Sequence, residues 1–204
     1  MVVVGFIGAM RSGKTLAMTI EAYKQHREGR KIFSNYALAF SYEHVDDQLV
    51  SDITKNNRTT EYDGAVICLD EIHVYMDSRN SSAKKNRLLS YFVTQSGKLD
   101  SLVMWSSQFL GQADKRLRLN TQILYKVERD IIRQGQKIML RQDDKRTDFL
   151  IDMHKHVFKE SSKGMGFVYE KTVTLRSPKK YFGLYDTTER IKYTGDEQKN
   201  DKPK

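Results

Sequence analysis

The feature that most constrains the fold of this chain is a glycine-rich turn near the N-terminus. Residues 8–15 read GAMRSGKT, which fits the pattern G-x-x-x-x-G-K-[ST]. The apolar run over 2–7 predicts a short buried strand, and the apolar positions between Leu16 and Ala22 predict a helix. A strand, a glycine turn and a helix in this order predict a loop that binds phosphate.

Each position of this loop has a physical role in phosphate binding. Gly8 and Gly13 allow backbone conformations closed to other residues and let the chain approach a ligand closely. Successive backbone N–H groups and the helix N-terminus can then bind phosphate oxygens. Lys14 is expected to reach the β- and γ-phosphates, and the Thr15 hydroxyl to bind Mg²⁺. The predicted nucleotide-binding residues are Gly8, Ala9, Met10, Arg11, Ser12, Gly13, Lys14 and Thr15.

A second apolar run, over 65–69, ends in two acidic residues. In an open parallel sheet, ligands bind outside the carboxyl ends of the strands, so both acids are expected at the edge where the glycine loop lies. We predict that Asp70 holds Mg²⁺, acting through water, and that Glu71 is the general base for the attacking water. An Asp-Glu pair favours hydrolysis of ATP over transfer of phosphate to a small acceptor.

A third apolar run, over 102–105, ends in Ser-Ser-Gln. The segments that end at Thr15 and Glu71 are expected to converge from neighbouring strands. If the strand over 102–105 lies between them, the Gln108 side chain faces the γ-phosphate. There it would bond that group or the lytic water and report the nucleotide state. The alternative is a surface glutamine at the end of a strand.

The order of strand and helix signals predicts an α/β fold with a mostly parallel sheet flanked by helices. Residues from 42 to the polar turn at Asn56-Asn57, and a segment that carries Leu88 to Val93, are expected to be helical. Beyond about residue 128 the pattern changes, and the runs over 127–142 and 166–175 predict an antiparallel β extension. We expect one domain over 1–192 and a polar, disordered tail over 193–204.

The formal net charge of +9 indicates a polyanionic partner, because Lys and Arg neutralise phosphates and release counterions. No motif for reading bases is present, so binding to the nucleic-acid backbone without sequence preference is expected. No apolar run approaches the roughly 20 residues of a membrane span, and the N-terminus lacks the basic leader of a signal peptide. The candidate basic clusters are Lys84-Lys85-Arg87, Lys115-Arg116-Arg118, Arg141 with Lys145-Arg146, and Lys179-Lys180.

The motifs GAMRSGKT, VICLDE and WSSQ, in this order in a short basic chain, resemble the FtsK/HerA superfamily of DNA-pumping ATPases. Within it, the chain is similar to the genome-packaging NTPases of turreted icosahedral viruses of archaea. The segment KKYFGLYDTTE, over 179–189, is similar to one in phage assembly ATPases of the zonula occludens toxin type. The core motifs span residues 1 to about 130.

The resemblance implies a RecA-like P-loop ATPase that uses ATP and Mg²⁺ and assembles into a ring, often of six subunits. It implies translocation of double-stranded DNA into a preformed capsid, and hence a location in the host cytoplasm and at a vertex of the capsid or its membrane. It also implies the residue roles given above and adds an arginine finger from the neighbouring subunit. Arg79 and Arg87 lie in the expected window and Arg79 is favoured, with Arg116 and Arg118 as alternatives.

Other classes of protein share parts of this pattern. A nucleotide or nucleoside kinase has the right length and the same loop, and a phage-type assembly or secretion ATPase is a further alternative. Residues 70–73 spell D-E-x-H, as in the second helicase superfamily, but those helicases need two RecA-like lobes and this chain is too short for both. A small GTPase is disfavoured because no N-K-x-D guanine signature is present.

Overall fold

The computed structural model of the chain describes residues 2–45, 62–74, 100–133, 136–138, 149–161 and 164–186. Its strands are β1 (Val2–Ile7), β2 (Ile32–Ser34), β3 (Glu43–His44), β4 (Val66–Leu69), β5 (Leu102–Ser107), β6 (Ile123–Arg133), β7 (Gln136–Ile138), β8 (Phe149–Ser161) and β9 (Gly164–Leu175). The α-helices are α1 (Lys14–Arg27) and α4 (Lys115–Asn120), and the 3₁₀ helices are η2 (Ile72–Val74), η5 (Leu110–Gln112) and η6 (Pro178–Leu184).

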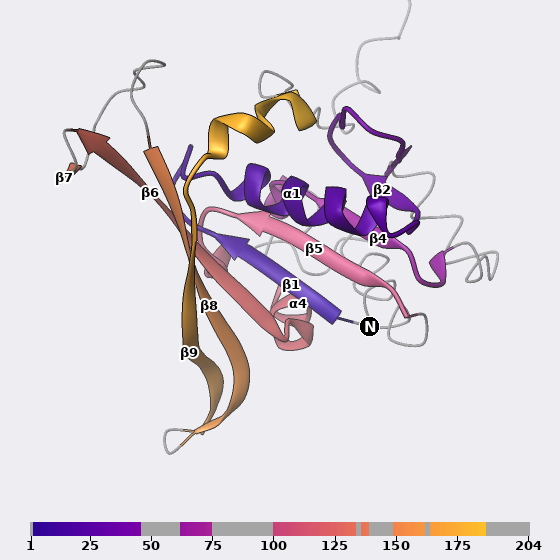
Figure 1. Cartoon of the computed structure of the whole chain (residues 1–204). Helices are drawn as coiled ribbons and strands as arrows, with labels where there is room; N and C mark the ends of the chain where they lie inside the picture. The colour runs from indigo at the N-terminus through magenta and orange to yellow at the C-terminus, as the bar shows by residue number, and fades with distance from the viewer. Residues whose placement is uncertain are drawn as a thin grey trace, which may run out of the picture.

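All nine described strands belong to one sheet in the order β3-β2-β4-β5-β1-β6-β8-β9, with β7 paired to β6 (Figure 1). In the part of the sheet that runs β3-β2-β4-β5-β1-β6, all neighbouring strands are parallel. Strands β7, β8 and β9 are added antiparallel. The predicted α/β fold with an antiparallel extension is therefore confirmed.

One expectation about this order is wrong. Strands β1 and β4 are not neighbours, because β5 lies between them and pairs with both. The segment that ends at Gln108 is therefore inserted between the two segments that carry Thr15 and Glu71. This is the arrangement on which the predicted sensor role of Gln108 depends.

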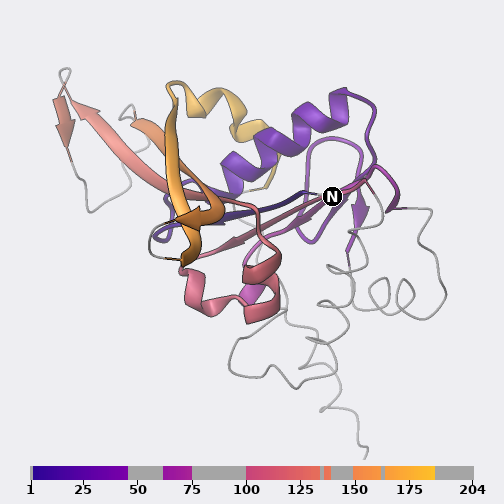
Figure 2. The same ribbon diagram turned by 90° about the horizontal axis from the view of Figure 1, so that it is seen from below.

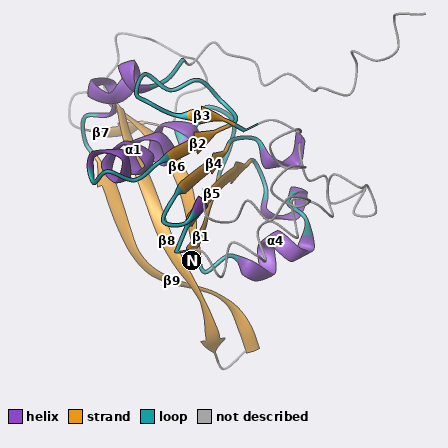
Figure 3. Cartoon of the chain, turned by 90° about the vertical axis from the view of Figure 1, so that its right-hand side faces the viewer, coloured by secondary structure: helices purple, strands orange, loops and turns teal. Residues whose placement is uncertain are grey.

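The parallel part of the sheet is covered on both faces, which explains why its strands are almost continuously apolar. Figure 2 shows α1 and η6 on one face and α4 on the other, and Figure 3 shows the same layers from the side. Successive side chains of a strand point to opposite faces. Val3 and Val103 accordingly pack in the core on the α4 side, and Val4 and Met104 pack in the core on the α1 side.

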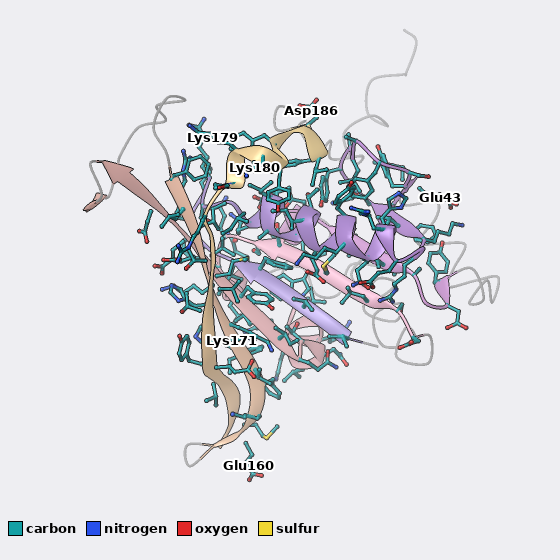
Figure 4. The ribbon with its side chains drawn as sticks, viewed as in Figure 1. Glu43, Glu160, Lys171, Lys179, Lys180 and Asp186 are labelled. Carbon is teal, nitrogen blue, oxygen red and sulfur yellow. The ribbon has the colours of Figure 1, made fainter. Side chains whose placement is uncertain are left out.

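Three long strands, β6, β8 and β9, extend beyond the ends of the parallel strands. The first residues of β6 pair with β1, and β6 then continues past the carboxyl end of β1 to pair with β7, while β8 pairs along β6 from Ile123 to Ile131. The hairpin of β8 and β9 runs past the opposite edge, where Glu160 lies near its tip (Figure 4). Lys179 and Lys180, at the start of η6, lie at the other end of the molecule in the same view.

The structure corrects part of the helix expected over 42–57, since Glu43–His44 form a strand that pairs with β2. The helix predicted from Leu16 is present as α1. The rest of the helix expected from residue 42, the helix expected at Leu88 to Val93 and the tail over 193–204 lie outside the described residues. The turn expected at Gly135 is flanked by the antiparallel pair of β6 and β7, as predicted. No described helix has both the length and the apolar character that crossing a bilayer requires.

Candidate nucleotide-binding site

The glycine loop over 8–13 leaves β1 and enters α1 at the carboxyl edge of the sheet. Gly8 and Gly13 have φ angles of 156° and 99°, in the region that favours glycine. A Cβ atom at Gly13 would lie 2.5 Å from Cδ1 of Ile151 in β8, and one at Gly8 would overlap the backbone carbonyl of Val127 in β6. The loop therefore packs directly against β6 and β8, and neither Gly8 nor Gly13 has room for a side chain.

Lys14 is the first residue of α1 and is only 5% exposed. Its Nζ donates a hydrogen bond to the backbone carbonyl of Ala9, across the loop, at 3.0 Å. Burial lowers the pKa of Lys14, while the negative charges of Glu71 and Asp70 oppose this shift. The loop thus encloses a cation that two carboxylates help to keep protonated.

Thr15 and Asp70 meet although 55 residues separate them in the chain. The Thr15 hydroxyl lies 3.0 Å from Oδ2 and 3.2 Å from Oδ1 of Asp70. Burial raises the pKa of Asp70, and hydrogen bonds from Ser106 and Thr15 and the charge of Lys14 lower it. The carboxylate is thus buried at the end of β4 against donors from β5 and from α1.

This oxygen pair fits Mg²⁺. Magnesium prefers octahedral oxygen ligands and usually keeps several waters, so a carboxylate can hold it through a bound water. Thr15 Oγ1 and Asp70 Oδ2, which share a hydrogen bond of 3.0 Å, are both oxygens of the kind that Mg²⁺ takes. Mg²⁺ commonly takes only one or two protein ligands when substrate phosphates supply others.

Glu71 follows Asp70 in a left-handed conformation with φ of 47°, which is strained for a residue other than glycine. Its backbone N–H donates to the Ser106 hydroxyl at 3.0 Å. Burial, and then the charge of Asp70, raises the pKa of Glu71, while Lys14 and His73 lower it. His73 Nδ1 lies 3.3 Å from Glu71 Oε2. The result is a half-buried carboxyl group beside the loop with an increased proton affinity.

Of the other predicted residues, the structure places one beside the loop and two elsewhere, and it does not describe the remaining two. Gln108 directly follows β5, between β1 and β4, and is half-buried at the edge where the loop lies. Arg79 and Arg87 lie outside the described residues. Arg116 is exposed and Arg118 half-buried on α4, on the face of the sheet opposite α1 (Figure 2).

Sequence reasoning missed two side chains that hold Asp70. The Ser106 hydroxyl donates to Asp70 Oδ1. Asn35 exchanges two hydrogen bonds with the backbone of Asp70, donating to its carbonyl at 2.9 Å and accepting from its N–H at 2.7 Å. Polar residues directly after a buried strand were the available signal, but only the strand order shows that β2 and β5 flank β4.

Solved structures with the same fold have very different sequences. The N-terminal domain of zonular occludens toxin from Neisseria meningitidis has a TM-score of 0.55 and 18% identity, over 91% of this chain and 98% of that chain. The genome packaging NTPase B204 from Sulfolobus turreted icosahedral virus 2, in complex with AMP, has a TM-score of 0.50 and 10% identity, over 83% of this chain and 96% of that chain.

At such identities the likeness shows the fold alone, and it confirms the fold that the motifs predicted. No family model and no curated protein sequence matches the chain.

Proposed function

We propose that the chain is a Mg²⁺-dependent ATPase that uses hydrolysis to translocate double-stranded DNA into a preformed viral capsid. The observation that carries the ATPase part is the meeting of Thr15 and Asp70 at 3.0 Å beside the glycine loop. Phosphoryl transfer needs positioning and charge neutralisation more than covalent chemistry, and these residues provide both.

The residue roles follow from the positions of the side chains. Backbone N–H groups of the loop and the cation of Lys14 bind the phosphates, and Thr15 and Asp70 hold Mg²⁺, which neutralises developing charge on the phosphates when bound. Glu71 accepts the proton of the attacking water, since its raised proton affinity suits a general base. Gln108 contacts the γ-phosphate or the lytic water and senses the nucleotide state.

DNA translocation is the finer part of the proposal. The net charge of +9 favours a polyanionic partner. Two of the candidate basic clusters fall on described elements, one on α4 and one at the start of η6. The NTPase from the turreted virus is described as packaging a genome, and we extend that role to this chain.

Assembly completes the proposed site. We expect a homo-oligomeric ring, of six subunits in the simplest case, in which Arg79 reaches the nucleotide of the neighbouring subunit. The ring would act in the host cytoplasm and dock at a vertex of the viral capsid or membrane.

Phosphate release measured under matched conditions tests this proposal. The chain is incubated with ATP and Mg²⁺ alone, with double-stranded DNA, and with nucleoside monophosphates. Hydrolysis without an acceptor, raised by DNA, is expected of the motor. ADP that forms only when a monophosphate is present would instead identify a nucleotide kinase.

A phage-type assembly or secretion ATPase is the second candidate. It is favoured by the toxin domain, which matches 98% of its own length to 91% of this chain. If this chain is such an assembly protein and uses nucleotide only as a structural switch, Glu71→Gln should leave its function intact. The packaging motor requires turnover and should lose function with the same substitution.

A further inference from the structure

A short polar segment at the end of β2, which has no role in the proposed chemistry, contacts both α1 and the end of β4. Ser34, Asn35 and Tyr36 end β2 and continue beyond it, and their exposures are 0%, 3% and 3%. Burying polar groups lowers stability unless they are hydrogen-bonded. Each of these three side chains has a partner, and the partners of two of them lead to the metal-binding pair.

Asn35 connects the segment to Asp70. Its side-chain amide donates to the Asp70 carbonyl at 2.9 Å and accepts from the Asp70 N–H at 2.7 Å. The Asn35 backbone N–H also donates to the carbonyl of Cys68 at 3.2 Å. These bonds continue the pairing of β2 with β4 by one residue and fix the backbone from which the Asp70 carboxylate projects.

Tyr36 connects the same segment to Thr15. Its hydroxyl is 2.8 Å from the hydroxyl of Thr19, one turn into α1. The Thr19 hydroxyl donates in turn to the backbone carbonyl of Thr15 at 2.8 Å. Because the Thr19 proton is used in that bond, the Tyr36 hydroxyl is the donor in the contact between the two side chains.

Ser34 holds the two connections in one rigid turn. Its hydroxyl donates to the Tyr36 carbonyl at 2.7 Å and accepts from the Tyr36 N–H at 3.2 Å. A single three-residue segment therefore contacts both halves of the site, the first turn of α1 and the end of β4.

We propose that Tyr36, acting through Thr19 on a segment that Asn35 anchors to Asp70, is a positioning residue that sets the separation between the Thr15 hydroxyl and the Asp70 carboxylate, and thereby the affinity of the nucleotide complex for Mg²⁺. This inference rests on the proposed function, since it concerns the same metal pair. Magnesium demands near-ideal octahedral geometry, so a small change in the spacing of the two groups that hold the ion and its bound water weakens its binding.

The test is the Mg²⁺ dependence of binding of a fluorescent ATP analogue to the full chain. Tyr36→Phe and, separately, Thr19→Val each remove one hydroxyl of the connection with little change in shape. A buried hydrogen bond contributes about 0.5–1.5 kcal/mol, so the Mg²⁺ concentration at half-saturation should rise about two- to tenfold. Affinity for the analogue without Mg²⁺ should stay within about twofold, because the loop and Lys14 are untouched.

Tyr62→Phe is the matched control. It removes the hydroxyl of a tyrosine that is 1% exposed and packs on Phe33 in the core on the α4 side. Its Mg²⁺ dependence should match that of the unsubstituted chain. Melting temperature is recorded for every variant, so that a general loss of stability is separated from a change in metal affinity.

The possible results separate a failure of the positioning role from a failure of the proposed ATPase function. If the unsubstituted chain responds to Mg²⁺ and both site variants respond at the same concentration, the positioning role is overturned while the ATPase stands. The positioning role is also overturned if the variants lose affinity equally with and without Mg²⁺. If the unsubstituted chain binds the analogue with no response to Mg²⁺, the proposed function fails and the inference fails with it.

Discussion

At the residue scale, Asp70 is 8% exposed, and the burial of its carboxyl group opposes ionisation. Hydrogen bonds and Lys14 offset only part of that effect, so its pKa stays above the ordinary value of 3.8. A carboxyl group with a raised pKa binds more protons in the folded than in the unfolded chain. It therefore lowers stability as the pH rises from its ordinary pKa through the raised one.

The first prediction follows from this loss of stability with rising pH. Asp70→Asn should raise the melting temperature of the unliganded chain by about 2–4 °C at neutral pH, equivalent to roughly 1 kcal/mol. The gain should shrink as the pH falls, because the native carboxyl group takes up a proton more readily than an ordinary aspartate does. Calorimetry from pH 4 to pH 8 measures it. A variant that is less stable than the native chain at neutral pH would contradict the account, as would one that keeps Mg²⁺-dependent nucleotide binding.

Residues of the site differed in how far the sequence could predict them. The sequence could propose the loop residues and the pair Asp70-Glu71 as candidates because the spacing of each motif is local. Asn35 and Ser106 were not, since their roles come from β2 and β5 flanking β4, which no local pattern shows. The left-handed conformation of Glu71 was equally hidden, because glutamate has no preference for it.

At the element scale, the glycine loop depends on strands that come more than 100 residues later. Strand β8 presses Ile151 against Gly13, and β6 presents the carbonyl of Val127 to Gly8. The sequence predicted β1, β4, β5 and α1 from apolar runs, but it predicted neither β8 nor the support that the antiparallel extension gives to the loop. Contacts of this kind are set by register, and a single sequence does not encode register locally.

The second prediction compares two glycines that share a backbone conformation. Gly13 and Gly29 have φ of 99° and 87°, but a Cβ would meet Ile151 at Gly13 and nothing within 4 Å at Gly29. Gly29→Ala should lower stability by about 1–2 kcal/mol through backbone strain alone. Gly13→Ala should lower it by about 1–3 kcal/mol more through overpacking.

Ile151→Val provides the internal check on this comparison, because it removes Cδ1, the atom nearest to the added methyl group. In denaturant unfolding, part of the extra loss of Gly13→Ala should be recovered in the Ile151→Val background. Equal losses at Gly13 and Gly29 would show that β8 does not constrain the loop.

At the scale of the whole molecule, the excess of Lys and Arg over Asp and Glu should dominate contacts with DNA. The third prediction is that the affinity for double-stranded DNA falls steeply as the salt concentration rises and does not depend on the DNA sequence. For six to ten phosphate contacts, affinity should fall by roughly 10³ to 10⁵ between 50 and 200 mM salt. Fluorescence anisotropy with two unrelated duplexes measures both properties. Binding that is indifferent to ionic strength would refute the electrostatic explanation.

The fourth prediction concerns assembly. If Arg79 completes the site of a neighbouring subunit, turnover per chain should rise with protein concentration, and Arg79→Ala should lower it by roughly 10³- to 10⁵-fold. Nucleotide affinity should not change, because the loop of the same chain is intact. Arg87→Ala is the matched control. Full activity in a verified monomer would exclude a finger supplied by a second subunit.

The central claim is that Lys14, Thr15, Asp70 and Glu71 together bind and hydrolyse ATP. Its most direct test is Glu71→Gln, with ATP binding and phosphate release measured on the same sample in the presence of Mg²⁺. We expect affinity for ATP to stay within about twofold and turnover to fall by roughly 10²- to 10⁴-fold, the usual contribution of a general base. Unchanged turnover in the variant, or no phosphate release by the native chain with DNA present, would contradict the claim.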